Sequence, residues 1–159
     1  MRRDLVDIVA RLSALPGLDA VGMTTNGLLL SKLLPALGDA GLTSVNVSLD
    51  TLQPLRFEAI TRRQGFQRVR DSIDAALALV LPQRTGSESG SGNEERVSAG
   101  SPTRRLSVKV NCVVMRGANE DELADFVALT KDVPLDVRFI EWMPFDSNRC
   151  VDKSTGDKA

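Results

Sequence analysis

The chain has 159 residues, of which 42% are hydrophobic and 26% charged, with 20 Lys and Arg against 21 Asp and Glu. This composition is typical of a globular domain with its own core. A formal net charge of −1 argues against nucleic-acid binding, which needs clustered basic side chains. No apolar run reaches the roughly 20 residues of a membrane span, and the first residues lack the apolar stretch of a secretory signal. We therefore expect an intracellular chain with no nucleic-acid or membrane partner.

Histidine is absent, and cysteine occurs only at Cys112 and Cys150. The absence of histidine excludes Ser-His and Cys-His nucleophiles and the commonest catalytic zinc ligand. The two cysteines are too few for a disulfide framework and too far apart for a local zinc knuckle. Cys112 alternates with apolar neighbours, which predicts a small buried side chain, whereas Cys150 lies in a polar tail and is predicted to be an exposed thiol.

The first predicted elements are a helix and a strand. Apolar residues at helical spacing predict a helix over residues 4–14, ended by a Pro-Gly pair. Residues 20–25 are predicted to be a strand that runs into Asn26-Gly27, a pair that favours a tight turn with positive φ.

A second helix and strand follow. Ser31 is predicted to cap a helix that stops at Gly41, with Pro35 tolerated in its first turn. Residues 44–50 alternate between apolar and polar, which predicts the second strand.

Composition then divides the chain. A helix is predicted over 66–80, closing a unit of βα elements over 1–81. Residues 82–105 are rich in Ser, Gly, Glu and Arg, which predicts a low-complexity, disordered insertion. Further βα units are predicted over 106–146, followed by a polar tail over 147–159.

After the insertion, the predicted elements are a strand over 106–115, a helix and a last strand over 135–143. Asn119 and Glu122 are predicted to form the cap of this helix, with Val127 on its buried face beside Leu123 and Phe126. Helices and strands thus alternate along the chain, which favours βα units and a parallel sheet.

Three predicted strands carry one apolar and one polar face, unlike strands covered on both sides in a doubly wound sheet. We therefore predict a barrel, or part of one, with helices outside and a charged ligand inside. The inward positions are predicted to be Thr24, Asn46, Ser48, Lys109, Asn111 and Arg138. A closed eight-stranded barrel takes about 250 residues and has an apolar interior, so the chain is predicted to be part of something larger. A half-solvated antiparallel sheet is the alternative.

These polar positions suit an anionic nucleotide. Lys109 and Arg138 are predicted to share a phosphate or carboxylate, or else to be solvated at a barrel mouth. Thr24 opens a Thr-Thr-Asn-Gly segment that either contacts a nucleobase or ribose or forms a plain turn. Ser48 and Asp50 could bind a ribose hydroxyl, while Asp50 could instead be a turn or N-cap residue.

Four segments in the same order resemble the GTP 3′,8-cyclases, the radical S-adenosylmethionine enzymes also called molybdenum cofactor biosynthesis protein A. They are Thr24-Thr-Asn-Gly-Leu-Leu-Leu, Val45-Asn-Val-Ser-Leu-Asp-Thr-Leu, Val108-Lys-Val-Asn-Cys-Val-Val-Met-Arg-Gly-Ala-Asn-Glu-Asp-Glu and Val137-Arg-Phe-Ile-Glu-Trp-Met-Pro-Phe-Asp. The resemblance covers the chain except the insertion and the last residues. It implies an α/β fold, a portion of an incomplete parallel (β/α)6 TIM-like barrel.

The resemblance also implies a reaction and its cofactors. Members hold S-adenosylmethionine against one [4Fe-4S] cluster and GTP against a second. They are lyases that convert GTP to (8S)-3′,8-cyclo-7,8-dihydroguanosine 5′-triphosphate through a 5′-deoxyadenosyl radical, in the first step of molybdenum cofactor (molybdopterin) biosynthesis. The implied partners are GTP, a second copy in a homodimer, and the cyclic pyranopterin monophosphate synthase that uses the product. The implied compartment is the cytoplasm or the mitochondrial matrix.

Individual roles come from matching positions in the motifs. The resemblance implies that Thr24 and Lys109 contact GTP. It implies that Ser48 contacts S-adenosylmethionine and that the backbone of Met143 meets the adenine of this cofactor.

The chain also departs from the family pattern. It lacks the Cys-x3-Cys-x2-Cys motif, the second cysteine trio, the Gly-Gly-Glu-Pro segment and the C-terminal arginines. Two cysteines cannot ligate a [4Fe-4S] cluster, so we expect neither metal ligands nor catalytic residues here. We expect a central fragment that supplies orientation and charge contacts and is inactive in isolation. The alternative is an inactive fragment or nucleotide-binding module without either cluster.

Overall fold

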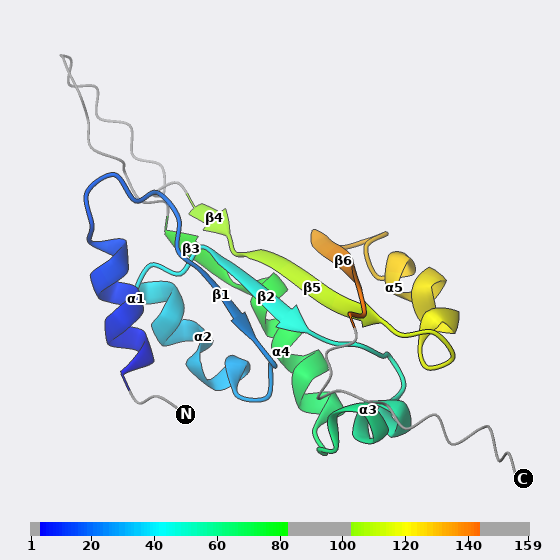
Figure 1. Ribbon diagram of the computed structural model, residues 1–159. Coiled ribbons are helices and arrows are strands. Elements are labelled where there is room, and N and C mark those ends of the chain that lie inside the picture. The colour runs from blue at the N-terminus through cyan, green and yellow to red at the C-terminus, as the bar shows by residue number, and fades with distance from the viewer. Residues whose placement is uncertain (1–3, 83–102, 144–159) are drawn as a thin grey trace, which may run out of the picture.

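The computed structural model describes residues 4–82 and 103–143 (Figure 1). In chain order its elements are α1 (Leu5–Ser13), β1 (Gly22–Thr25), α2 (Leu30–Asp39), β2 (Ser44–Ser48), α3 (Pro54–Thr61), α4 (Phe66–Ala78), β3 (Val80–Pro82), β4 (Thr103–Arg105), β5 (Ser107–Val114), the 3-10 turn η1 (Glu120–Glu122), α5 (Leu123–Ala128) and β6 (Leu135–Glu141). This order confirms the predicted alternation of helices and strands. None of the described helices is both long and apolar enough to cross a membrane.

The main sheet has four strands in the order β1-β2-β5-β6, and every neighbouring pair is parallel (Figure 1). The chain is therefore an α/β structure, as predicted. The antiparallel alternative is wrong for this sheet, because each return crosses over through a helix. The described strands do not close into a barrel.

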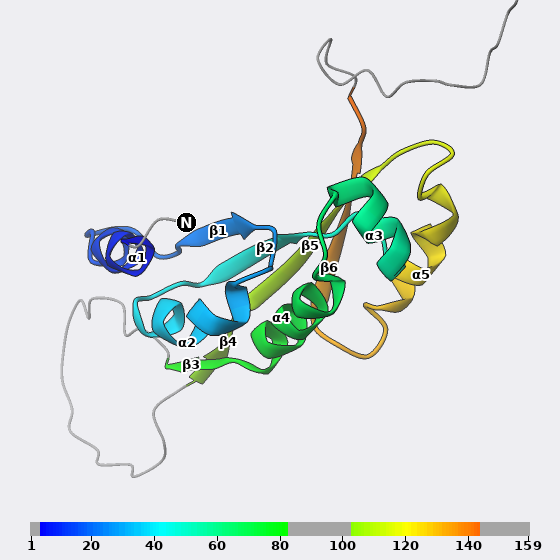
Figure 2. The same cartoon turned by 90° about the horizontal axis from the view of Figure 1, so that it is seen from below.

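The core lies between this sheet and the helices. Figure 2 shows α2 and α4 together on one side of the sheet, whereas the other face of β1, β2 and β5 carries no described helix. The buried side chains on the covered side come from the sheet and from these two helices: Val45, Val47, Leu49, Val108, Val110, Cys112, Leu30, Leu34, Leu37, Val69, Ile73 and Ala76. The apolar residues that alternate along the strands thus pack against the apolar residues at helical spacing in α2 and α4.

The start of α2 differs from the prediction. The helix begins at Leu30, so Ser31 lies inside its first turn and does not cap it; the Ser31 N–H donates to Ser72 Oγ at 3.1 Å. Pro35 lies beyond the first turn, where its missing N–H leaves the Ser31 carbonyl without a helical donor. Both residues are exposed, so water can satisfy that carbonyl. Gly41 follows the helix with a φ of 103°, consistent with the predicted stop.

Helix α3 was not predicted from the sequence. Its apolar periodicity is weak, because only Phe57 is buried whereas Leu55 is 84% exposed. The available signal was Pro54 at its first position, a place that suits proline. The helix ends at Arg62, which adopts a left-handed conformation with a φ of 54°.

Asn119 occupies the N-cap position of η1 and Glu122 that of α5, but the predicted capping bonds of their side chains are wrong. Neither side chain caps the helix; both are buried and bond to the segment that follows β2. Only Phe126 of the predicted apolar face is fully buried, and Val127 is 56% exposed. The α5 helix is six residues long, so its buried stripe is narrower than the sequence pattern implies.

The edges of the predicted insertion are ordered. β3 pairs with β4 in an antiparallel hairpin, and Leu81 is buried in the core. The boundaries 82–105 are therefore too wide, because Pro82 and Thr103–Arg105 belong to strands. The disorder predicted between these strands, and the polar tail, fall outside the described residues and stay predictions. β4 leads directly into the amino end of β5, so the hairpin lies away from the strands' carboxyl ends (Figure 1).

Candidate functional site

The open face of the sheet carries two rows of polar side chains. The register aligns Thr24, Asn46 and Lys109 in one row across β1, β2 and β5. A second row aligns Ser48, Asn111 and Arg138 across β2, β5 and β6. Partners in a ladder point to the same side of a sheet, so these positions share one face, as predicted.

The first row presents a lysine with no ion pair to its neighbours. Asn46 Nδ2 donates to Thr24 Oγ1 at 3.4 Å, which joins the β1 and β2 members. Lys109 is half-buried, and Asp136 continues the row on β6, yet no ion pair joins the two. Within residues 4–82 and 103–143 the ammonium group of Lys109 thus has no ion pair, which suits an anion bound on this face.

The second row contains an unsatisfied acceptor. Asn111 Oδ1 is buried and has no hydrogen-bond partner among the described residues. An unpaired buried acceptor costs about 1–3 kcal/mol, so such a group is normally matched by a bound water or ligand. Ser48 and Arg138 flank this asparagine in the register, so their side chains leave the sheet on the same face as the open acceptor.

The Thr-Thr-Asn-Gly segment forms the turn after β1. Thr25 Oγ1 accepts from the Gly27 N–H at 3.2 Å, and Asn26 Oδ1 accepts from the Leu28 N–H at 3.3 Å. Gly27 has a φ of 76°, and a Cβ there would lie 3.0 Å from Val69 Cγ1. The plain-turn interpretation therefore accounts for Thr25, Asn26 and Gly27, while Thr24 keeps its place in the polar row.

A pocket of about 360 Å³ opens at the carboxyl ends of β1 and β2. Its polar lining includes Asn26, Ser48, Asp50 and Arg63, and Phe57 lies among its apolar lining residues. Ligands of parallel α/β sheets bind at this edge of the strands. Sequence reasoning missed Arg63, because it follows the unpredicted helix α3 and no pattern brings it to the strand ends.

Asp50 ties the ends of two strands together. Its Oδ1 accepts from the Val113 N–H at 2.8 Å, across the gap between β2 and β5. Burial raises the pKa of this carboxyl, and the bond from Val113 partly offsets that rise. The N-cap hypothesis is wrong, because Gln53 occupies the N-cap position of α3. The described carboxylate bond runs across the strands and not to a neighbouring turn residue, and the second carboxylate oxygen has no described hydrogen-bond partner.

Cys112 is a core residue, as predicted. It is buried, and burial, with smaller effects from the charges of Asp50 and Glu122, raises the pKa of its thiol to about 12. A [4Fe-4S] cluster needs several thiolates, whereas this thiol stays neutral at physiological pH. Cys150 falls outside the described residues. Across 4–82 and 103–143 no cluster of acidic, His or Cys side chains is placed to bind a metal, and the cysteines present do not fit an iron–sulfur cluster.

Met143 lies just beyond β6 and is 61% exposed. The preceding Trp142 N–H donates to the Val114 carbonyl at 3.3 Å, which keeps this segment beside β5. No described contact joins Met143 to Ser48. The structure thus brings Thr24, Ser48 and Lys109 onto one face and leaves Met143 at its margin.

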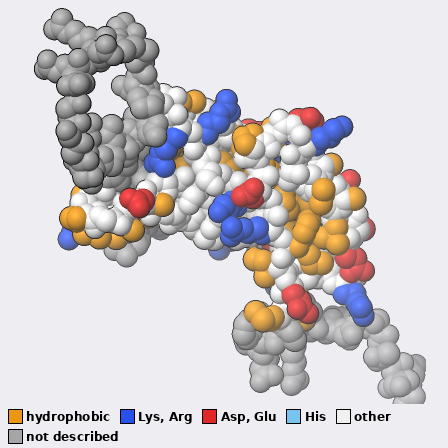
Figure 3. Space-filling view, turned by 90° about the horizontal axis from the view of Figure 1, so that it is seen from above, with side chains coloured by type: hydrophobic (Ala, Val, Ile, Leu, Met, Phe, Trp, Pro, Cys, Tyr) orange, Lys and Arg blue, Asp and Glu red, His pale blue; other side chains and the backbone are white. Residues whose placement is uncertain are grey.

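β6 is the edge strand of the main sheet and carries exposed apolar side chains. Val137 is half-buried, and Phe139 and Ile140 are each more than 40% exposed. Phe139 meets Phe126 of α5 edge-on, with ring centroids 6.2 Å apart. In Figure 3 hydrophobic side chains gather on this side of the molecule beside basic and acidic ones.

Comparison with known proteins places this arrangement in a family. The chain is 52% identical over 149 residues to molybdenum cofactor biosynthesis protein 1 of Mus musculus, covering 94% of this chain and 20% of that protein. It is 47% identical over 148 residues to the mitochondrial GTP 3′,8-cyclase of Arabidopsis thaliana. This match covers 93% of this chain and 32% of that protein. It is 39% identical over 144 residues to the GTP 3′,8-cyclase of Listeria monocytogenes. This match covers 91% of this chain and 36% of that protein.

The chain thus spans between a fifth and about a third of the length of these relatives. The family model described as Radical SAM superfamily matches residues 1–87, which include β1, β2 and the turn between β1 and α2. The match covers more than half of the sequence. The chain belongs to the Radical SAM superfamily.

Proposed function

We propose that this chain forms one wall of the active site of a GTP 3′,8-cyclase, the enzyme that starts molybdenum cofactor biosynthesis. The observation that carries the proposal is the open polar face, where Thr24, Asn46 and Lys109 lie in one row and Ser48, Asn111 and Arg138 in the next. The names of the relatives from Arabidopsis thaliana and Listeria monocytogenes support GTP as the substrate.

Each of the four implied residues has a role in this proposal. Lys109 binds the GTP triphosphate through its ammonium, and Thr24 positions the nucleoside through its hydroxyl. Ser48 holds S-adenosylmethionine at the carboxyl end of β2, where the pocket opens. The backbone of Met143 meets the adenine, a role supported only by the motif, since this residue lies at the margin of the face.

The proposal extends to the rest of the enzyme. The sheet is one part of an incomplete (β/α)6 barrel with the polar face inside, and the whole enzyme acts as a lyase with S-adenosylmethionine and two [4Fe-4S] clusters. The residues of this chain do not fit a cluster, so the isolated chain is inactive and supplies binding and orientation only. The proposed partners are a second copy and the synthase that uses the product. The proposed compartment is the cytoplasm or the mitochondrial matrix, and the name of the Arabidopsis relative supports the latter.

Binding of GTP to the chain tests the proposal. Lys109→Ala removes the cation on the open face and is expected to raise the GTP dissociation constant by about tenfold or more, because a charge-assisted bond to phosphate is lost. Lys32→Ala is the matched control, since Lys32 is exposed on α2, a helix that packs against the other face. Isothermal titration with both variants gives the answer. Equal affinities of wild type and Lys109→Ala, or no GTP binding by wild type, would contradict the proposal.

A further inference from the structure

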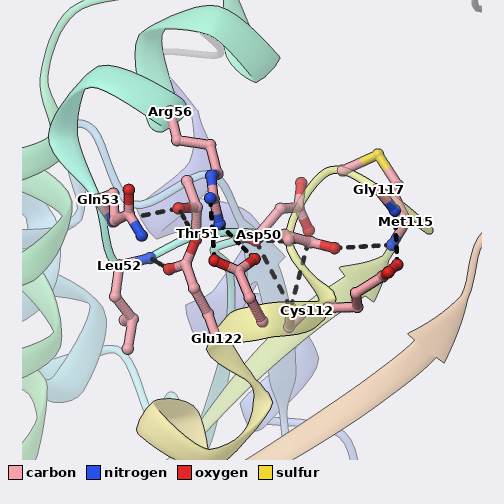
Figure 4. A network of polar contacts seen from close by, with 12 residues as sticks. Asp50, Thr51, Leu52, Gln53, Arg56, Cys112, Met115, Gly117 and Glu122 are labelled. Atoms are coloured by element: carbon pink, nitrogen blue, oxygen red, sulfur yellow. Dashed lines mark hydrogen bonds and ion pairs between the residues drawn. The ribbon is translucent and has the colours of Figure 1, made fainter.

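A buried carboxylate lies beneath the loop that follows β2. Glu122 comes from η1 and is 1% exposed, although it is an acidic residue (Figure 4). One oxygen accepts from Thr51 Oγ1 at 2.6 Å, and the other accepts from the Leu52 N–H at 2.5 Å. Arg56 at the start of α3 completes the set through an ion pair to the same carboxylate. All these partners belong to one segment, about 70 positions earlier in the sequence.

Neighbouring bonds fix the same segment to β5. Asn119 Nδ2 donates to the Asp50 carbonyl at 2.6 Å and to the Val113 carbonyl at 2.8 Å. Its Oδ1 accepts from the Met115 N–H at 2.7 Å. The loop after β2 is therefore bonded to Asn119 and Glu122, two polar residues of the turn that follows β5 (Figure 4).

Stability alone is a poor reason for a buried carboxylate at this position. Removing an ion from water is costly, and well-packed apolar residues often replace a buried ion pair without loss of stability. Apolar packing has no direction, whereas a carboxylate with three partners fixes one geometry. Such a group therefore suits a segment whose position must be exact for binding.

The segment held in this way borders the pocket. Ser48 is the last residue of β2, and Ser48, Asp50 and Phe57 all line the pocket of about 360 Å³. Thr51, Leu52 and Arg56, the partners of Glu122, all lie between the lining residues Asp50 and Phe57 in the sequence. A shift of the clamped loop would displace this wall of the pocket. Lys109 lies in the middle of β5, two positions before Asn111 and outside the clamped segments.

We propose that Glu122 is a positioning residue for the cofactor end of the site: it clamps the β2–α3 loop through Thr51, Leu52 and Arg56 and so places Ser48 and Asp50 for S-adenosylmethionine. This inference rests on the proposed function and adds to it a residue that does not touch the cofactor. It predicts a selective defect, in which the cofactor affinity depends on the clamp and the GTP affinity does not.

Glu122→Gln in the full chain tests this selectivity. The amide keeps the shape but loses the charge and one acceptor, so the dissociation constant for S-adenosylmethionine is expected to rise by about tenfold. The GTP dissociation constant is expected to stay within about twofold of wild type. Glu120→Gln is the matched control, because Glu120 is an exposed carboxylate of the same turn that bonds only locally, to the Gly117 N–H. Isothermal titration measures both ligands on each variant.

A second pair of variants covers the case in which Glu122→Gln fails to fold. Thr51→Val removes the hydroxyl donor with nearly unchanged shape and is expected to weaken the cofactor selectively, whereas Thr51→Ser restores the donor and the affinity. Unchanged cofactor affinity in Glu122→Gln or Thr51→Val would overturn the inference, as would equal weakening of both ligands. A wild-type chain that binds GTP but not S-adenosylmethionine would overturn the inference alone. A wild-type chain that binds neither would overturn the proposed function as well.

Discussion

The two faces of the β1-β2-β5-β6 sheet have opposite characters although they share one backbone. On the covered face, Val45, Val47 and Val110 are buried beneath helices. The open face of β1, β2 and β5 carries no described helix (Figure 2). Asn46 and Lys109, the neighbours of these valines in sequence, belong to it and are half-buried. Successive side chains of a strand point to opposite faces of the sheet. Every second residue of a strand therefore packs in the core, and the residues between them are open to a ligand.

This difference separates stability from function within single strands. Burial of apolar side chains supplies most of the favourable free energy of folding, and the covered face holds nearly all of these side chains. The open face contributes little burial and keeps an unpaired acceptor at Asn111 Oδ1. Neighbouring substitutions on the two faces should therefore have different consequences.

The sharpest contrast is between Leu49 and Ser48. Leu49 is 1% exposed on the covered side, so Leu49→Ala is expected to lower the free energy of unfolding by about 2–5 kcal/mol through lost burial and a cavity. Ser48→Ala, one position earlier on the open face, is expected to change it by about 0.5 kcal/mol or less. Urea unfolding followed by circular dichroism measures both. A similar decrease in the free energy of unfolding in both variants would contradict the proposed difference between the two faces.

The covered face also contains a buried hydroxyl that tests whether its polar groups are structural. Ser72 Oγ donates to the Gly27 carbonyl at 2.8 Å and accepts from the Ser31 N–H. Ser72→Ala removes both bonds and leaves the Ser31 N–H without this partner, while the Gly27 carbonyl keeps the bond from the Leu30 N–H at 3.2 Å. The free energy of unfolding is expected to fall by about 1–3 kcal/mol. Ser31→Ala removes only an exposed hydroxyl and serves as the control, again by urea unfolding. An unchanged free energy of unfolding in Ser72→Ala would show that the hydrogen bond between α4 and the turn after β1 does not stabilise the fold.

The alkaline stability of the chain sharpens the comparison further. The thiol of Cys112 on the covered face has its pKa raised from 9.0 to about 12. Below pH 9 the thiol is neutral in both states; above it, the unfolded chain loses the proton while the folded chain keeps it. The free energy of unfolding should therefore fall from about pH 9 to about pH 12.

Unfolding curves over this pH range should show the effect. In a Cys150→Ser background, the chain with Cys112 is expected to lose stability more steeply than Cys112→Ala, whose side chain does not ionise. Parallel pH slopes in the two chains would contradict a buried, neutral thiol.

Much of this division could be predicted from the sequence. The alternation of Val45, Val47 and Leu49 with Asn46 and Ser48 predicts the two faces, because the period of a strand is local and unaffected by distant residues. The helix–strand order likewise predicts the parallel sheet. These features depend on patterns repeated over many residues, so no single exception removes them.

Features set by single long-range contacts could not be predicted. Asn119 and Glu122 have the spacing of a helix cap, but their partners are Asp50, Thr51 and Leu52, far earlier in the chain. Capping patterns describe bonds between neighbouring residues. Here the same side chains bond to residues 50–52 and make no capping bond. Arg63 reached the pocket through α3, whose single buried residue gave too weak a periodicity to detect.

Mapping the bound nucleotide on the chain tests the central claim most directly. In ¹H–¹⁵N spectra of the labelled chain titrated with GTP, the account predicts amide shifts concentrated at Thr24, Asn46 and Lys109 and their neighbours on the open face. Amides of α2 and α4 should move little. Shifts concentrated in these helices, or no shifts at all, would contradict the claim that the open polar face is the nucleotide-binding surface.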